Sequence, residues 1–214
     1  MKSSEFPHIL AAILLLTLVA GFGFALKSDW GMVGVSFGFS AIIIVVSVLT
    51  KKLAAYLLDA DVEHELWKVT TYGLRAGDRF KKPIPAGIIF PIFFSLITLG
   101  ALKFMGFLTY EARALKYRAS KRFGFYSYTE MTDWHNGLIG AAGVLAVLVL
   151  AVISYFLPAA NIEYLAKLSA YYAFWSLLPV SKLDGTQIFF GSKILWSVLA
   201  SNASIFTLLA VITV

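Results

Sequence analysis

Long apolar runs separated by shorter polar segments dominate this chain. A helix needs about 20 mainly apolar residues to cross the roughly 30 Å of hydrocarbon in a bilayer. Five runs approach or reach that length, and they cover residues 6–26, 31–49, 138–157, 164–180 and 194–214. The pattern therefore predicts an all-α fold, a polytopic helical membrane bundle with about five full spans.

A sixth apolar run, residues 84–107, is interrupted by glycine and proline. The polar segments on either side of it, 51–82 and 108–136, are both basic. A full crossing would place these segments on opposite faces of the membrane, against the tendency of basic loops to stay in the cytoplasm. A re-entrant run would keep both on one face. We therefore expect five to six transmembrane segments with 84–107 re-entrant, and basic loops on the cytoplasmic side of the cell membrane.

The two polar segments differ in character. Residues 51–82 mix charges with scattered apolar side chains, which predicts an amphipathic segment at the membrane interface. Residues 108–136 read as a polar loop, although residues 102–114 could supply a small β-hairpin. No internal repeat is evident, so we treat residues 1–214 as a single integral membrane domain.

The composition agrees with a membrane location and argues against nucleic-acid binding, disulfides and thiolate-bound zinc. Hydrophobic residues make up 59% of the 214 and charged residues only 14%, so the bilayer is the expected environment. The net charge of +6 fits basic cytoplasmic loops, and no motif accompanies it that would indicate nucleic-acid binding. The chain has no cysteine, which excludes disulfides and thiolate-bound zinc.

The stretch Leu177-Leu178-Pro179-Val180-Ser181-Lys182-Leu183-Asp184-Gly185 places a carboxylate directly after an apolar segment. Ionisable groups at the edge of the hydrocarbon are costly and indicate a functional site. This stretch resembles the LLP…LDG motif of the site-2 protease family, the intramembrane zinc metalloproteases. The resemblance implies that Asp184 corresponds to a zinc ligand and that the fold is similar to the site-2 protease core.

The remaining zinc-site residues of that family are missing. The family places two histidines one helical turn apart, with a glutamate after the first. Aligned with archaeal members, Val46 and Thr50 stand at the histidine positions and Ser47 at the glutamate. The resemblance therefore implies a pseudoprotease that binds no zinc and holds transmembrane segments or other membrane proteins. The candidate groove residues are Tyr172, Trp175, Pro179 and Asp184.

Two other functions stay open. An active intramembrane zinc metalloprotease would need unusual ligands drawn from His64, His135 and Asp184, with Glu65 as the general base. A small transporter subunit is the second alternative, although the spans carry almost no buried charge apart from Lys103. In the first alternative zinc is the cofactor, whereas the leading hypothesis expects none.

Asp184 and His135 also have purely structural readings. An Asp-Gly pair is common in turns, so we expect the Asp184 carboxylate to cap a helix that covers residues 186–190. Asp133, Trp134 and His135 precede an apolar span, where an acidic residue and a tryptophan suit the start of a helix at the headgroup level.

The expected partners follow from the membrane location. They are the lipid bilayer and the transmembrane helices of other proteins, with no nucleic acid. Gly31, Gly34 and Gly38 leave a smooth helix face, which allows close packing within the bundle or in a homo-oligomer.

Overall fold

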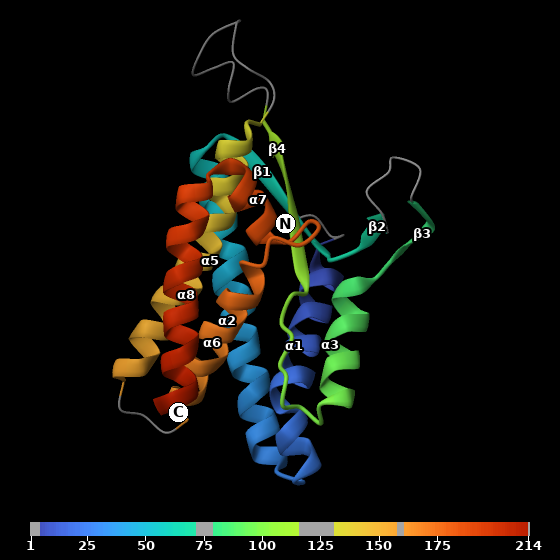
Figure 1. Cartoon of the computed structure of the whole chain (residues 1–214), viewed down its shortest axis with the longest axis vertical. Helices are drawn as coiled ribbons and strands as arrows, with labels where there is room; N and C mark the ends of the chain where they lie inside the picture. Colours follow the sequence, from blue (N-terminus) through green and yellow to red (C-terminus); the bar gives the residue numbers. More distant parts are fainter. Residues whose placement is uncertain (1–4, 72–78, 116–130, 158–160, 214) are drawn as a thin grey trace, which may run out of the picture.

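The computed structural model describes residues 5–71, 79–115, 131–157 and 161–213. Within these ranges the chain is mostly helical, and four helices are long and apolar enough to cross a membrane. They are α1 (Phe6–Leu26), α2 (Trp30–Leu57), α5 (Asp133–Phe156) and α8 (Lys193–Thr213). The four helices run side by side along the length of the molecule (Figure 1). A helical bundle with four helices that could span a membrane, as the apolar pattern predicts, is the architecture observed.

The expectation of about five full spans needs a correction. The run 164–180 forms helix α6 (Ile162–Ser176), which has 15 residues and is about 22 Å long. This length falls short of the roughly 30 Å of hydrocarbon. Pro179 cannot extend the helix, and Leu177 already ends it. Helix α6 therefore stops inside the bundle, and the LLP…LDG stretch follows at that depth.

The two ends of the run 84–107 lie close together in the structure. Helix α3 (Ala86–Ile97) has only 12 residues, and an extended stretch returns alongside the bundle (Figure 1). The backbone N–H of Gly87 donates to the Trp67 carbonyl at 2.9 Å, and the Trp67 N–H donates to the Phe107 carbonyl at 2.7 Å. Both ends of the run therefore meet at Trp67, which is the geometry of a re-entrant segment.

Four strands in the described part of the chain make the fold more than purely helical. Strand β1 (Ala60–Leu66) pairs antiparallel with β4 (Leu108–Ala114) over seven unbroken positions. Strand β2 (Val69–Thr71) pairs with β3 (Arg79–Ile84) in a second two-stranded sheet. The expected interfacial segment 51–82 thus finishes α2 and then supplies three strands. The expected hairpin within 102–114 is instead a long-range pair, and residues 116–130 of the expected polar loop lie outside the described ranges.

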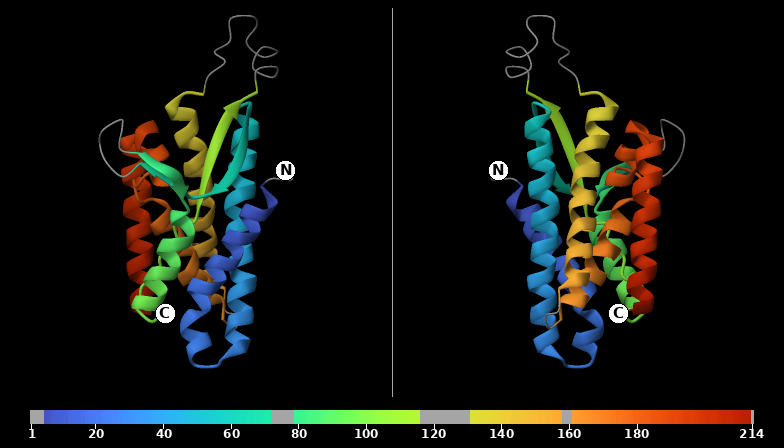
Figure 2. Two further views of the ribbon diagram at one scale, coloured as in Figure 1. Left: turned by 90° about the vertical axis from the view of Figure 1, so that its right-hand side faces the viewer. Right: turned by 90° about the vertical axis from the view of Figure 1, so that its left-hand side faces the viewer.

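The strands and helix α7 (Asp184–Gly191) gather toward one end of the bundle, which we call the strand end (Figure 2). The opposite end holds the α1–α2 turn, the end of α3 and the start of α6 (Figure 1). The apolar core between the ends joins α1, α2, α5 and α6, with side chains such as Leu16, Ile44, Val147 and Leu168 fully buried. The candidate site lies where this core meets the strand end.

Candidate functional site: a buried ion pair

A buried ion pair joins α2 to the LLP…LDG stretch. The Nζ of Lys51 lies 2.5 Å from Oδ2 of Asp184, and both side chains are no more than 3% exposed. The span expected over residues 31–49 would leave Lys51 just beyond its end, in the expected interfacial segment 51–82. Helix α2 instead continues to Leu57, which leaves Lys51 inside the protein, facing α5 and α7.

Asp184 does not cap a helix, so that expectation was wrong. Helix α7 begins at Asp184 itself, Leu183 takes the cap position, and no side chain caps the helix. The carboxylate receives the Lys51 ammonium through Oδ2, and its Oδ1 has no hydrogen-bond partner among the described residues. Burial raises the pKa of Asp184, and the positive charge of Lys51 opposes that rise.

Three glycines make the site possible by letting side chains or backbones approach closely. A Cβ on Gly143 of α5 would lie 2.5 Å from Cε of Lys51, and one on Gly140 would lie 2.6 Å from the Tyr110 hydroxyl. A Cβ on Gly185 would overlap the carbonyl of Leu177. The glycines at the start of α5 therefore leave space for the side chains of Lys51 and Tyr110. Gly185 lets the backbone of the LLP…LDG loop pack against the carbonyl of Leu177, the first residue of the loop.

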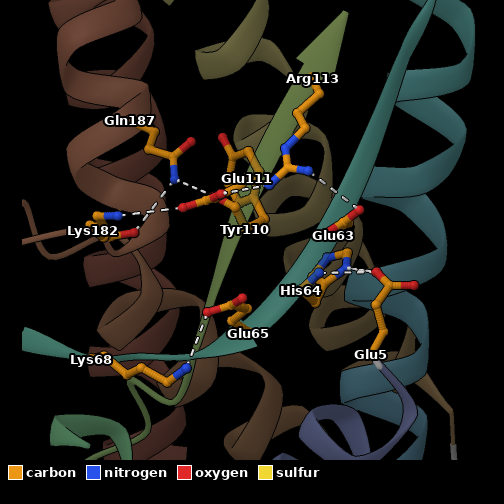
Figure 3. Close-up of polar contacts among 10 residues, drawn as sticks. All are labelled: Glu5, Glu63, His64, Glu65, Lys68, Tyr110, Glu111, Arg113, Lys182 and Gln187. Carbon is orange, nitrogen blue, oxygen red and sulfur yellow. Dashed lines mark hydrogen bonds and ion pairs between the residues drawn. The ribbon is translucent and has the colours of Figure 1, made fainter. Parts of the chain in front are cut away.

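Tyr110 of β4 covers the other side of the ammonium. The Lys51 Nζ lies 5.0 Å from the centre of the Tyr110 ring, at cation–π distance. The Tyr110 hydroxyl donates to the Asn136 carbonyl at 2.6 Å, and the Gln187 amide donates to the Tyr110 carbonyl at 2.9 Å. Figure 3 shows Gln187 reaching toward Tyr110. Burial and the negative charge of Asp184 raise the pKa of Tyr110, so the phenol stays neutral.

Ser47 and Lys51 occupy the α2 face that looks toward this site. They are one helical turn apart, and each is 1% exposed. Tyr172 of α6 lies beside Ser47 and close enough to Asp184 for the charge of the carboxylate to act on it. Val46 and Thr50 are only partly buried, and the Thr50 hydroxyl donates to the Val46 carbonyl along the helix. The pair that faces Asp184 is thus one residue later than the sequence alignment placed it.

A second polar cluster fixes the chain just before α1. The Glu5 carboxylate accepts hydrogen bonds from Lys52 Nζ at 2.6 Å and from the His64 backbone N–H at 3.0 Å. The imidazole Nδ1 of His64 lies 3.5 Å from the same carboxylate (Figure 3). Burial would raise the pKa of Glu5, but the two hydrogen bonds and nearby charges lower it overall. Burial, together with the charge of Lys51, lowers the pKa of His64 to about 3, so this imidazole is neutral at pH 7.

The alternative zinc ligands are not assembled around one point. His64 and Glu65 are neighbours on β1 and point to opposite faces, since His64 is 1% exposed and Glu65 pairs with Lys68 at the surface. His135 lies in the first turn of α5 and contacts Thr132, which caps that helix. Among the described residues, no three His, Asp or Glu side chains come together as metal ligands. The interpretation of residues 133–135 as the start of a helix is confirmed, with Thr132 as the cap.

The candidate groove residues separate into buried and open ones. Tyr172 and Asp184 are buried. Pro179 is exposed, and its neighbours Leu178 and Val180 border a cavity of about 220 Å³. Aromatic side chains supply the other wall of this cavity, which we call the aromatic cavity; they are Trp67, Phe90, Phe94 and Phe104. Trp175 is partly buried, its ring centre lying 4.7 Å from that of Phe104.

Sequence reasoning missed Lys51 and Tyr110 as parts of the site. A signal for Lys51 was present, because Ser36, Ser40, Ser47 and Lys51 recur at helical spacing within an apolar run. The strict alternation from Ala60 to Leu66 could likewise have predicted β1 and the burial of His64. Tyr110 carried no comparable signal.

Comparison with known proteins gives no relative to set beside this geometry. No family model, curated protein or solved structure matches the chain.

Proposed function

We propose that this chain is a membrane-embedded binding protein similar to site-2 proteases, without their zinc chemistry, that holds transmembrane segments or other membrane proteins. The observation that carries the proposal is the Lys51–Asp184 pair. The carboxylate of the LLP…LDG stretch is neutralised by an ammonium from within the chain. A lysine ammonium has no lone pair to offer a metal, so the residues around Asp184 do not fit a zinc site.

The aromatic cavity supports the binding half of the proposal. It lies between the re-entrant segment and the LLP…LDG loop, and its walls are wholly apolar side chains such as Phe94 and Leu183. The face of α3 near it exposes Ile89, Phe93 and Leu96, which are at least 47% exposed. An apolar transmembrane segment is the occupant that such a surface suits in a bilayer.

Metal content and proteolysis test the proposal directly. The purified protein should hold no stoichiometric zinc, and it should leave a co-expressed single-span reporter protein uncleaved. One zinc per chain together with chelator-sensitive cleavage would sink the proposal and restore the metalloprotease alternative.

A designed zinc site tests the resemblance itself. The triple variant Ser47→His, Val48→Glu, Lys51→His puts two imidazoles on the α2 face opposite Asp184, and it should gain one zinc per chain. The matched control is Val46→His, Ser47→Glu, Thr50→His, one residue earlier on the same helix. Its imidazoles face away from Asp184, so it should gain none. Equal zinc in both variants, or none in either, would contradict a site-2-protease-like arrangement of α2 and α7.

A further inference from the structure

Two lysines meet at the end of the bundle opposite the strands. Lys103 lies on the extended stretch that follows α3, and its Nζ is 5.2 Å from the centre of the Tyr164 ring. Lys167 follows Tyr164 by three residues on α6, so the two side chains share a helix face. The charge of Lys167 is close enough to act on Lys103. One ammonium therefore lies over the Tyr164 ring, and a second lysine lies on the same helix face as that ring.

These two lysines lack an anionic partner within the described part of the chain. Glu163 precedes Lys167 by one helical turn, yet the two side chains form no ion pair. Both lysines are partly buried, so water screens their mutual repulsion less than at an open surface. A partly desolvated pair of like charges favours the entry of an anion between them.

A groove of about 170 Å³ opens beside Lys103. Three elements form its walls: the stretch after α3, helix α6 and helix α8. The α6 wall is aromatic and consists of Tyr171, Phe174 and Trp175, while Thr207 lies on the α8 wall. The groove thus combines the Lys103 cation with apolar rings along its α6 wall, and Lys167 lies one helical turn before Tyr171 on the same helix.

The Lys103 side of the groove lies toward the end of the bundle where α1 ends and α6 begins. The Tyr164 hydroxyl donates to the Ala20 carbonyl near the end of α1, and the backbone of Gly100 packs against Phe22. On α8, neighbours of Thr207 such as Ile205 and Leu208 are more than half exposed and therefore face lipid in a bilayer. Amphipathic lysines at this depth place their charge at headgroup level.

We propose that this groove binds an anionic phospholipid, with the phosphate between Lys103 and Lys167 and one acyl chain along the aromatic wall of α6. Lysine binds phosphate as a point charge, and two lysines match a diester that carries one negative charge better than a zwitterionic headgroup. The groove shares no lining residue with the aromatic cavity and none with the Lys51–Asp184 pair, so the two proposals can be tested separately.

Lipid retention in native mass spectrometry tests the site. The purified chain, delipidated in detergent, is offered phosphatidylglycerol or phosphatidylcholine of the same acyl length. The wild-type chain should bind phosphatidylglycerol at least tenfold more tightly, and Lys103→Gln with Lys167→Gln should remove that preference. Lys68→Gln, which removes an exposed lysine at the strand end, should leave the preference unchanged.

Further variants and a headgroup analogue separate the effects of lysine charge, lipid acyl chain and protein folding. Lys103→Arg keeps the charge and should keep the preference, and Lys167→Gln alone should weaken it if the double variant does not fold. Glycerol phosphate, which has the headgroup chemistry without acyl chains, should bind at least tenfold more weakly than the lipid. Equal retention of the two lipids, an unchanged preference in a folded lysine variant, or glycerol phosphate binding as tightly as lipid would each overturn the proposal.

Discussion

Buried or partly buried lysines pair with carboxylates at one end of the bundle, whereas at the other end they have no such partner among the described residues. At the strand end, Lys51 meets Asp184 and Lys52 meets Glu5, so each ammonium is matched by a carboxylate from a distant part of the chain. At the other end, Lys103 faces the ring of Tyr164 and the charge of Lys167, with no carboxylate partner in the described residues.

The difference has a physical reason. Charges are costly in a low-dielectric interior unless they are paired, so a matched pair serves to fix packing. An unmatched charge persists only if water or a ligand can reach it. Lys103 borders an open groove, whereas Lys51 is 1% exposed. In this protein the paired charges therefore hold the packing, and the unpaired charges are where we propose that a ligand binds.

The largest loss of stability is expected when one partner of the buried pair is removed. Lys51→Met leaves the Asp184 carboxylate buried without a cation, which should lower the free energy of unfolding by roughly 3–5 kcal/mol. Unfolding by SDS in mixed micelles measures this change. Lys68→Met, at an exposed ion pair, is the control and should cost about 0–1 kcal/mol.

The double variant Lys51→Met with Asp184→Asn sharpens the same prediction. Removal of both charges leaves no buried ion, so the double variant should be more stable than Lys51→Met alone. A double variant that is less stable than either single one would show that the two side chains do not act as a pair.

Acid should destabilise the strand end through His64. The pKa of His64 is about 3 in the folded chain against an ordinary value of 6.5, so the unfolded chain binds more protons between these values. The His64 contribution to the free energy of unfolding is therefore fully present above about pH 6.5. It falls on acidification, by about 2 kcal/mol from pH 7 to pH 5. The pH dependence of thermal unfolding measures it.

The matched variant for this pH effect is His64→Gln, which takes up no proton. Its melting temperature should change less between pH 7 and pH 5 than that of the wild-type chain. Glu5 does not interfere in this window, because its lowered pKa places its own effect below about pH 4.5. An identical pH profile in both proteins would assign the acid sensitivity to another group.

A methyl group on α5 should disturb the same pair sterically. Gly143→Ala brings a Cβ to 2.5 Å from Lys51 Cε, and the confined lysine cannot move away without breaking its ion pair. We expect a loss of roughly 1–3 kcal/mol, typical of overpacking. Gly34→Ala on α2 meets nothing within 4 Å and should instead stabilise its helix slightly. Equal effects of the two alanines on SDS unfolding would contradict the tight fit.

The smallest effect is expected at the opposite end. Lys103→Gln breaks no ion pair and relieves the repulsion from Lys167, so the free energy of unfolding in detergent should change by no more than about 0.5 kcal/mol. A loss comparable with that of Lys51→Met would mean that Lys103 holds the fold together, and the contrast between the two ends would fail.

The sequence by itself determined the expected membrane setting, because the length of an apolar run is a local property that can be compared directly with the thickness of the bilayer. The interruptions in 84–107 and the basic segments beside it likewise predicted a segment that turns back, and its ends do meet at Trp67. The start of α5 at residues 133–135 was also readable, since caps and interfacial aromatic residues act within a single turn.

Only the tertiary structure decided the site. Lys51 and Asp184 are 133 residues apart, and whether a lysine near a helix end reaches the headgroups or turns inward depends on the helices beside it. Gly140 and Gly143 of α5 provide the space, and Tyr110 enters through the pairing of β4 with β1. Asp184 was visible in the sequence, but its partner depends on packing between distant elements, which local patterns do not encode.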